Sequence, residues 1–349
     1  MKLFNYLFII IFSLAPIFCN GQVLSPIIKN LEGLDNNKSG IHNYWLEMGN
    51  NTYGYPLLVP IIVIQGQFDG PTLGLTAAIH GNELNGIAII HRLVDYIDTK
   101  VLRGRIIAVP GLNSVSIELD EREFIDKQDL NRNFPGKKNG NRSAQFVYNI
   151  NEKILPFFDT QIDFHTASFG RINTMYVRAD LTNNTIRALS KLQESDIILN
   201  SKEASVGSDS ASSRTMRAES ALKDIPTITV EYGNPQVYQN EIIQRGLKGI
   251  INTLGWLKMY GNIELQNIED MATYCKKSYW IYMEEGGFLE VLVDLNQKLI
   301  KGEKIAIVRN AFGEIIKEYV APEDGIVIGK SSNPANMNGG RIIHLGILE

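Results

Sequence analysis

Cysteine is nearly absent from this chain, since its 349 residues include only Cys19 and Cys275. Cys19 lies in an apolar leader that we expect to be removed, which would leave one thiol and no intramolecular disulfide. A long basic run is also missing, and the net charge is −4, so the composition gives no indication of a nucleic-acid partner. With so few thiols, a metal ion would have to be held by histidine and carboxylate side chains.

Charged residues are missing from the start of the chain as well. After Lys2, residues 3–17 are uncharged and strongly apolar, a stretch too short for a comfortable membrane span and typical of a secretory signal. Small residues just before Gln22 place the cleavage there. We therefore expect a signal peptide over residues 1–21 and a secreted or periplasmic mature protein without a membrane span. A lipoprotein anchored through Cys19 and an uncleaved N-terminal anchor are the alternatives.

Apolar strand patterns alternate with helical patterns between residues 57 and 262. Strands are predicted over residues 57–64, 73–79, 105–109, 160–164 and 225–230, and helices just after residue 83 and over residues 146–158, 186–199 and 242–259. This alternation predicts an α/β fold whose central sheet is mostly parallel or mixed, with helices on both faces. Residues 22–56 form a lead-in to this predicted catalytic domain.

The pattern changes after residue 261. Short β runs separated by turns rich in glycine, asparagine and proline fill residues 275–349, and none of them has a helical period. This pattern of short strands and turns predicts a separate, small all-β domain, either a barrel or a sandwich, at the C-terminus.

Histidine is scarce, yet two of the five histidines stand at the ends of predicted strands. His80, His165 and Glu231 each follow a buried apolar run, and open α/β sheets bind ligands beyond the carboxyl ends of their strands. Glu83 lies three residues after His80 across a strand-to-helix turn, which brings the two side chains to one side. Two histidines and one glutamate are a known catalytic zinc set with an open fourth position. We therefore predict one Zn²⁺ per chain, held by His80, Glu83 and His165.

Two further polar residues lie in a charged loop between residues 113 and 141. Asn131 and Arg132 are adjacent there, and a guanidinium group can grip a substrate carboxylate through two parallel hydrogen bonds. A surface ion pair between Arg132 and Asp129 is the alternative. The remaining histidines have no evident partner in the sequence; they are His42, His91 and His344.

Four motifs together resemble one enzyme family. HGNE at 80–83, DLNRNFPG at 129–136, DFHTA at 163–167 and VEYGN at 230–234 occur in the order and at roughly the spacing of the succinylglutamate desuccinylase/aspartoacylase family, a branch of the zinc carboxypeptidase A-like hydrolases. The resemblance covers about residues 57–260 and implies a zinc carboxypeptidase-like fold. It implies that Zn²⁺ binds as predicted above, that Glu231 is the general base, and that Arg122 polarises the scissile carbonyl.

The resemblance also implies how substrate is held. Asn131 and Arg132 would bind a substrate carboxylate, and Arg217 would be a second arginine that grips it, with Arg214 close by in the sequence. The C-terminal segment is similar to the β domain of bacterial family members and to a barrel-sandwich hybrid of the biotinyl or lipoyl type. It has no lysine at a carrier hairpin, so we interpret it as structural or as the contact of a homo-oligomer.

The function that follows from the resemblance is the hydrolysis of an N-acyl amino acid or a related small amide, with esterase activity as a side reaction. A metallocarboxypeptidase that acts on peptides uses the same residues and is the alternative within enzymes. A non-catalytic binding protein that retains the fold is the alternative outside enzymes. The expected partner is therefore a small-molecule substrate.

Overall fold

The computed structural model describes residues 25–34, 38–202 and 214–349. The expected signal peptide over residues 1–21 lies outside the described residues, as does Cys19, and both remain predictions. Within the described ranges, no helix combines the length and the apolar character needed to cross a membrane.

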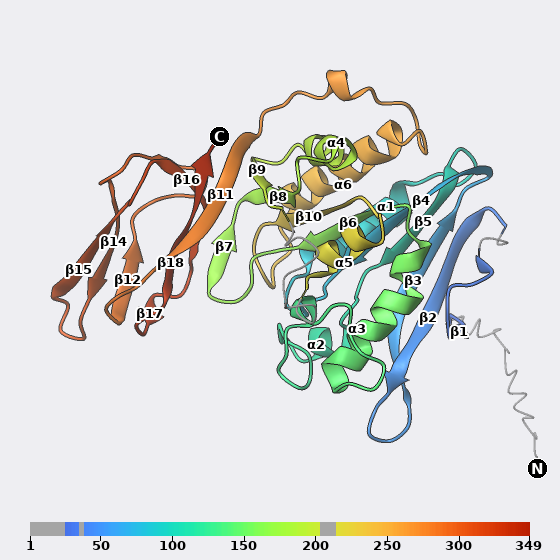
Figure 1. Cartoon of the computed structure of the whole chain (residues 1–349), viewed down its shortest axis with the longest axis horizontal. Coiled ribbons are helices and arrows are strands. Elements are labelled where there is room, and N and C mark those ends of the chain that lie inside the picture. Colours follow the sequence, from blue (N-terminus) through green and yellow to red (C-terminus); the bar gives the residue numbers. More distant parts are fainter. Residues whose placement is uncertain (1–24, 35–37, 203–213) are drawn as a thin grey trace, which may run out of the picture.

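A long mixed β-sheet and a smaller antiparallel sheet organise the molecule (Figure 1). The strands before residue 240 are β1 (Ile27–Ile28), β2 (Gly40–Asn50), β3 (Pro56–Gln65), β4 (Phe68–Ala77), β5 (Arg103–Val109), β6 (Thr160–His165), β7 (Arg171–Asn173), β8 (Met175–Ala179), β9 (Ile197–Asn200) and β10 (Thr227–Tyr232). Those after it are β11 (Thr273–Tyr282), β12 (Gly287–Val291), β13 (Lys298–Leu299), β14 (Lys304–Arg309), β15 (Ile315–Val320), β16 (Gly325–Ser331), β17 (Ala335–Asn336) and β18 (Arg341–Leu348).

Helices cover both faces of the long sheet. They are α1 (Asn85–Tyr96), α2 (Ser114–Glu118), α3 (Arg142–Lys153), α4 (Asn184–Leu192), α5 (Met216–Leu222) and α6 (Asn240–Trp256), with 3₁₀ turns η2 (Leu130–Arg132), η3 (Leu155–Phe157) and η4 (Leu265–Asn267). One core joins α1, α4 and α6 to the sheet, and another joins α3 to the opposite face. Successive side chains of a strand point to opposite faces of the sheet. On β5, Ile106 therefore belongs to the first core and Ile107 to the second. The predicted α/β fold class is confirmed.

The centre of the long sheet is parallel, and this parallel part positions the candidate site. Strands β5, β4, β6 and β10 lie side by side and run in one direction. Their carboxyl ends therefore meet at one edge of the sheet. Strands β3 and β8 flank this set in the antiparallel sense, which makes the sheet mixed.

Two segments differ from the sequence-based expectations. The helix expected over residues 186–199 ends at Leu192, and Ile197–Asn200 form β9 between β8 and β11. A short apolar run of a buried strand lacks the alternation that would separate it from a helix. The lead-in before residue 56 contributes β2, which pairs along nearly its whole length with β3.

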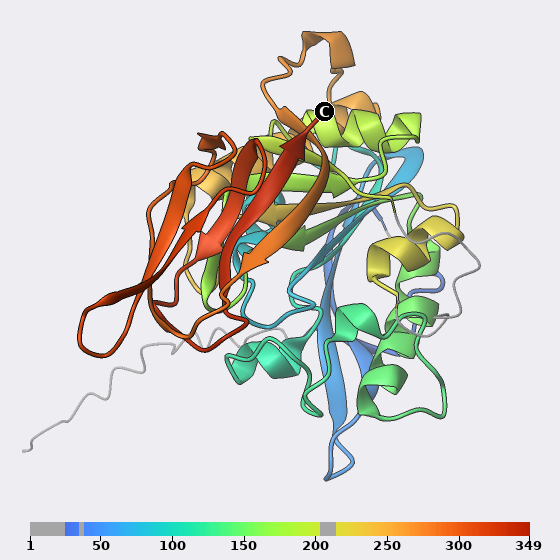
Figure 2. The same ribbon diagram turned by 60° about the vertical axis from the view of Figure 1, so that its left-hand side comes forward.

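The C-terminal β region continues the long sheet. Strand β11 pairs in parallel with β9, and β18, β16 and β13 follow in order. Strands β15, β14, β12 and β17 form the second sheet, and a hydrophobic core of its own lies in this region. Figure 2 shows this part packed beside the α/β part, and β7 reaches across to pair with β16. The sequence predicts a boundary between residues 262 and 275, and that segment contains η4.

The packing beneath β4 generates a stability prediction. A Cβ atom at Gly74 would lie 2.3 Å from the ring of the buried Phe158, so Gly74→Ala should destabilise the fold by about 1–3 kcal/mol through overpacking. Urea denaturation measures the change. Gly111→Ala is the control, since its Cβ would approach no atom more closely than the Cδ1 end of Ile117, at 3.2 Å. Equal costs for the two variants would contradict this account.

Candidate metal centre and active site

Three elements bring the predicted ligands to the edge where the parallel strands end. His80 follows β4, Glu83 stands just before α1, and His165 is the last residue of β6. The loop after β4 is tight, because a Cβ at Gly81 would lie 2.3 Å from the backbone carbon of Ser116. Only glycine fits there, so the HGNE sequence places His80 and Glu83 on one side of the turn.

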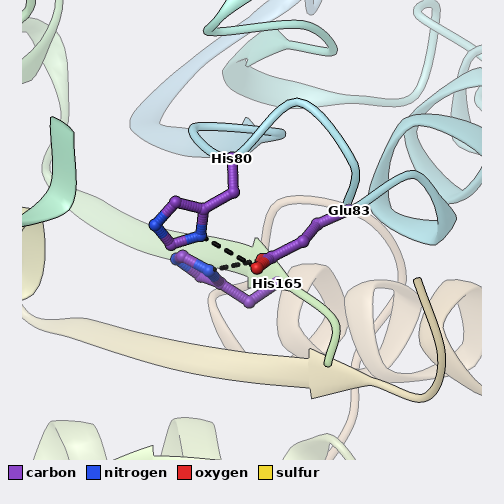
Figure 3. A group of neighbouring side chains, drawn as sticks. All are labelled: His80, Glu83 and His165. Atoms are coloured by element: carbon purple, nitrogen blue, oxygen red, sulfur yellow. Dashed lines mark hydrogen bonds and ion pairs between the residues drawn. The ribbon is translucent and has the colours of Figure 1, made fainter. Parts of the chain in front are cut away.

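The three side chains converge on one point (Figure 3). One ligand atom from each of His80, Glu83 and His165 lies within 4.8 Å of the others, and all three residues are buried. The Nδ1 atom of His80 is 2.9 Å from Oε1 of Glu83, and the Nδ1 atom of His165 is 2.8 Å from Oε2. Each carboxylate oxygen therefore faces one imidazole nitrogen.

Two aspartates hold the other nitrogen of each imidazole. The Nε2 atom of His80 is 3.0 Å from Oδ1 of Asp129, and that of His165 is 2.8 Å from Oδ2 of Asp163. Both Nδ1 atoms are thereby turned toward Glu83, as in carboxylate–histidine–metal arrangements. Buried Nδ1 of His80 has no well-aligned hydrogen bond despite its short distance to Glu83. This donor set fits a zinc ion.

Charge compensation shapes the same cluster. Burial would raise the pKa of the Glu83 carboxyl, but His80 and His165 hold that pKa well below its usual value. Burial would lower the pKa of His165, but Asp163 and Glu83 hold it well above. Carboxylates that favour a proton on buried His165 also favour a metal cation beside it. Both pKa shifts therefore agree with a cation site.

Arg122 lies against this cluster. Its Nη1 donates to Oε1 of Glu83 at 2.7 Å, and its Nη2 donates to Oδ2 of Asp129 at 3.0 Å. Burial would lower the pKa of this guanidinium, but the two carboxylates raise it. Asp129 thus pairs with His80 and Arg122, whereas Arg132 donates to the backbone carbonyl of Asn131. A simple surface pair of Arg132 with Asp129 is not what the structure shows.

Glu231 stands on β10 beside His165, with which it is in register. Its side chain is 13% exposed. The hydroxyl of Tyr176 donates to Oε1 at 3.3 Å, and Nδ2 of Asn173 donates to Oε2 at 3.3 Å. The Nε atom of Arg178 lies 3.7 Å from Oε1. Residues of β7 and β8 therefore hold both oxygens of this carboxylate.

Asn131 and Arg217, two of the residues predicted to hold the substrate carboxylate, lie around the start of α5. The Oδ1 atom of Asn131 accepts from the backbone N–H of Met216 at 2.7 Å, and its Nδ2 lies 3.4 Å from Nε2 of His165. Arg217 is buried and donates to the carbonyl of Ser201. Arg214 instead pairs with Glu219. Of the two neighbouring arginines, Arg217 is the one that lines the cavity described next.

Most of these groups line one polar cavity of about 540 Å³. All eight residues that the sequence predicts for the site line it: His80, Glu83, Arg122, Asn131, Arg132, His165, Arg217 and Glu231. Side chains of β7, β8, β11 and β18 also line it. The chemistry available in this space is that of a candidate cation site beside the Glu231 carboxylate, within a pocket lined by several arginines.

Several lining residues are not found by the sequence analysis. Arg171 and Asn173, then Tyr176 and Arg178, follow the DFHTA motif, and the spacing of two within each pair is the available signal for strands that present them to one face. His344 has no partner in the sequence, yet in the structure it stacks on Trp280, and the two ring centroids are 5.1 Å apart. This contact depends on the pairing of β11 with β18, which no local pattern reveals.

Comparison with known proteins agrees with the motifs. The model of the succinylglutamate desuccinylase/aspartoacylase catalytic domain matches residues 69–257. The chain belongs to this family, an enzyme family of deacylases, and the predicted resemblance is confirmed.

One relative and two solved structures are similar over most of the chain. The N-alpha-acetyl-L-2,4-diaminobutyric acid deacetylase of Halomonas elongata is 24% identical, over 82% of this chain and 84% of the relative. A product-bound ectoine utilization protein from Ruegeria pomeroyi is 21% identical with a TM-score of 0.78, covering 89% and 96% of the two chains. A succinylglutamate desuccinylase from a Silicibacter species is 22% identical with a TM-score of 0.78, covering 90% and 96%. The two structures share the fold.

The buried environment of His344 predicts a pH effect on stability. Burial lowers the pKa of this imidazole well below its usual value, and Arg178 and Arg171 lower it further. The unfolded chain binds a proton near pH 6.5 and the folded chain does not, so stability falls as the pH falls below about 6.5. Between pH 8 and pH 5.5, the unfolding free energy of the His344→Gln variant should fall by about 1 kcal/mol less than that of wild type. Urea denaturation at both pH values tests this; an unchanged loss in the variant would contradict it.

Proposed function

We propose that this protein is a zinc-dependent hydrolase that removes the acyl group from an N-acyl amino acid or a related small amide. The observation that carries the proposal is the convergence of His80, Glu83 and His165 beside Glu231 in one polar cavity. Membership of a deacylase family and the similarity to a deacetylase support it.

The buried triad would hold one Zn²⁺ through the Nδ1 atoms of both histidines and the carboxylate of Glu83. When bound, the ion would polarise the scissile carbonyl and make an acidified water available near neutral pH. Asp129 and Asp163 would keep the imidazoles oriented through their Nε2 atoms. Their role is to fix ring orientation, so that the metal site is preorganised.

Glu231 would be the general base. It would take a proton from the attacking water and later deliver it to the leaving amine. Asn173 and Tyr176 already orient its two oxygens, so little reorganisation would be needed. Arg122 has further N–H donors besides the two that bind Glu83 and Asp129. One of them would stabilise the negative charge that develops on the carbonyl oxygen.

The substrate carboxylate would bind at Arg132 and Arg217, with Asn131 fixing the loop that carries Arg132. A guanidinium fork suits this role because it can donate two parallel hydrogen bonds to one carboxylate. The C-terminal β region also lines the cavity, through Trp280 and His344. These residues limit the space in the cavity. A limited space favours a small acylated amino acid over the peptide substrate of a carboxypeptidase.

The metal assignment is tested by zinc content. Wild-type protein should bind about one Zn²⁺ per chain, and His165→Ala should lose it, since two ligands do not retain the metal of a three-ligand site. His91→Ala serves as a matched control because His91 lies on α1 and does not line this cavity. Elemental analysis after dialysis gives the stoichiometry. Full retention of zinc by the His165 variant would show that the ligand assignment is wrong.

The base assignment is tested by Glu231→Gln. This change keeps the shape of the side chain and leaves the three metal ligands intact, so zinc content should stay near one while kcat falls by roughly 10²–10⁴. The assay uses a panel of N-acetyl, N-succinyl and N-formyl amino acids beside blocked dipeptides. Hydrolysis of the dipeptides alone would favour the carboxypeptidase. Loss of zinc from the variant would make Glu231 a ligand and leave the base unassigned.

A further inference from the structure

A row of polar side chains lies inside the fold, on the face of the sheet that carries His165. Successive side chains of a strand point to opposite faces, so Gln161 and Asp163 on β6 share the face of His165. Ile162 and Phe164 point the other way, into the first hydrophobic core. Buried polar groups are costly unless each one finds a hydrogen-bond partner, so the partners of this row show what it can do.

Hydrogen bonds join the row into one chain that starts at His165. Its Nε2 atom is 2.8 Å from Oδ2 of Asp163, and Oδ1 of Asp163 accepts from Oγ1 of Thr76 on β4 at 2.8 Å. Thr76 in turn accepts from Nε2 of Gln161 at 3.1 Å, and Oε1 of Gln161 accepts from Oγ of Ser220 at 2.7 Å. The side chains of Thr76, Gln161 and Ser220 are fully buried, so no solvent is at hand to replace a lost contact.

The hydrogen bonds next to His165 run in one direction. A hydroxyl group has one proton to donate, and an amide nitrogen donates but does not accept. Because Thr76 accepts from the amide nitrogen of Gln161, its own proton is directed to Asp163. One oxygen of Asp163 is thereby occupied, and the other is left for the N–H at Nε2 of His165. The Nδ1 atom of His165 is then the one that faces Glu83.

The far end of the chain lies on α5. Ser220 stands within this helix, whose first residue, Met216, donates its backbone N–H to Asn131. Arg217 follows Met216 and lines the cavity. The chain that ends at His165 therefore begins on the helix that carries a residue proposed to hold the substrate carboxylate.

We infer that Thr76 and Gln161 are positioning residues of the metal site. They hold Asp163 from inside the fold, and through it they fix the orientation of the imidazole of His165. This inference rests on the proposed function, because it requires that His165 binds the metal. It extends the metal site to two residues that contact neither the metal ligands nor the cavity. An imidazole that is less firmly oriented would bind the cation less tightly.

A second buried threonine–glutamine pair provides a matched control. Nε2 of Gln193 donates to Oγ1 of Thr253 at 3.1 Å, the same distance as between Gln161 and Thr76. Thr253 donates its own proton to the carbonyl of Gly249 within α6, and both members of this pair are fully buried. Neither is among the described residues that line the cavity. A change here removes the same kind of contact away from the metal site.

The test measures the affinity for Zn²⁺ by competition with a chromophoric chelator. Valine has the shape of threonine without the hydroxyl group, so Thr76→Val removes the donor to Asp163 and should weaken zinc binding by about 10- to 100-fold. Gln161→Met leaves Thr76 in place and should weaken it by a smaller factor. Thr253→Val should bind zinc as wild type does. Urea denaturation of the metal-free proteins should show a similar loss of stability in the two valine variants, because each leaves buried groups without a partner.

A conservative variant separates positioning from a general loss of stability. Thr76→Ser keeps the hydroxyl group and should recover most of the zinc affinity. Unchanged zinc affinity in Thr76→Val, an equal loss in Thr253→Val, or a serine variant as weak as the valine variant would overturn the positioning role. If Thr76→Val does not fold, Gln161→Met is compared with Gln193→Met, and equal zinc affinities in that pair would overturn it.

These measurements distinguish this inference from the proposed function. If wild type binds zinc but hydrolyses none of the N-acyl amino acids, only the proposed reaction is contradicted, and a lower zinc affinity in Thr76→Val than in Thr253→Val still supports the positioning role. If wild type hydrolyses them and Thr76→Val keeps the full zinc affinity, only the positioning role is contradicted. A wild-type protein that binds no zinc would contradict both.

Discussion

The contact of Glu83 with two histidines is the constraint on which the site depends. One carboxylate presents an oxygen to each imidazole, and each imidazole is fixed from behind by an aspartate. This chain of contacts links the loop after β4 to the end of β6 and to the loop before η2. A buried group of three charged or polar residues is costly unless every member is satisfied. These contacts fix the three segments relative to one another.

The C-terminal β region packs against residues that line the cavity. Strand β7 pairs with β16, and a Cβ at Gly329 on β16 would lie 2.4 Å from Oδ1 of Asn173. Asn173 also contacts Glu231. A residue close to the proposed base is thus packed directly against the C-terminal region, which gives that region a structural role at the site rather than at the periphery alone.

Much of the fold and site could be predicted from the sequence, for identifiable reasons. The buried strands that precede His80, His165 and Glu231 are continuous apolar runs, and parallel strands bring such end positions together at one edge. The wall formed by β7, β8, β11 and β18 was not predicted, because it depends on pairing between segments far apart in the chain. Trp280 meets His344 only through the register of β11 with β18, and β9 resembles a helix in its apolar content.

The continuity of the long sheet has a consequence for how molecules reach the cavity. Enzymes built from two parts commonly admit substrate by a hinge motion between them. Here β9 is hydrogen-bonded to β11, and β7 to β16, so a hinge between the two parts would have to break two backbone ladders. Exchange of substrate and product is then left to side-chain and loop motions on a nearly rigid frame, and such motions are typically faster than the collective movement of domains.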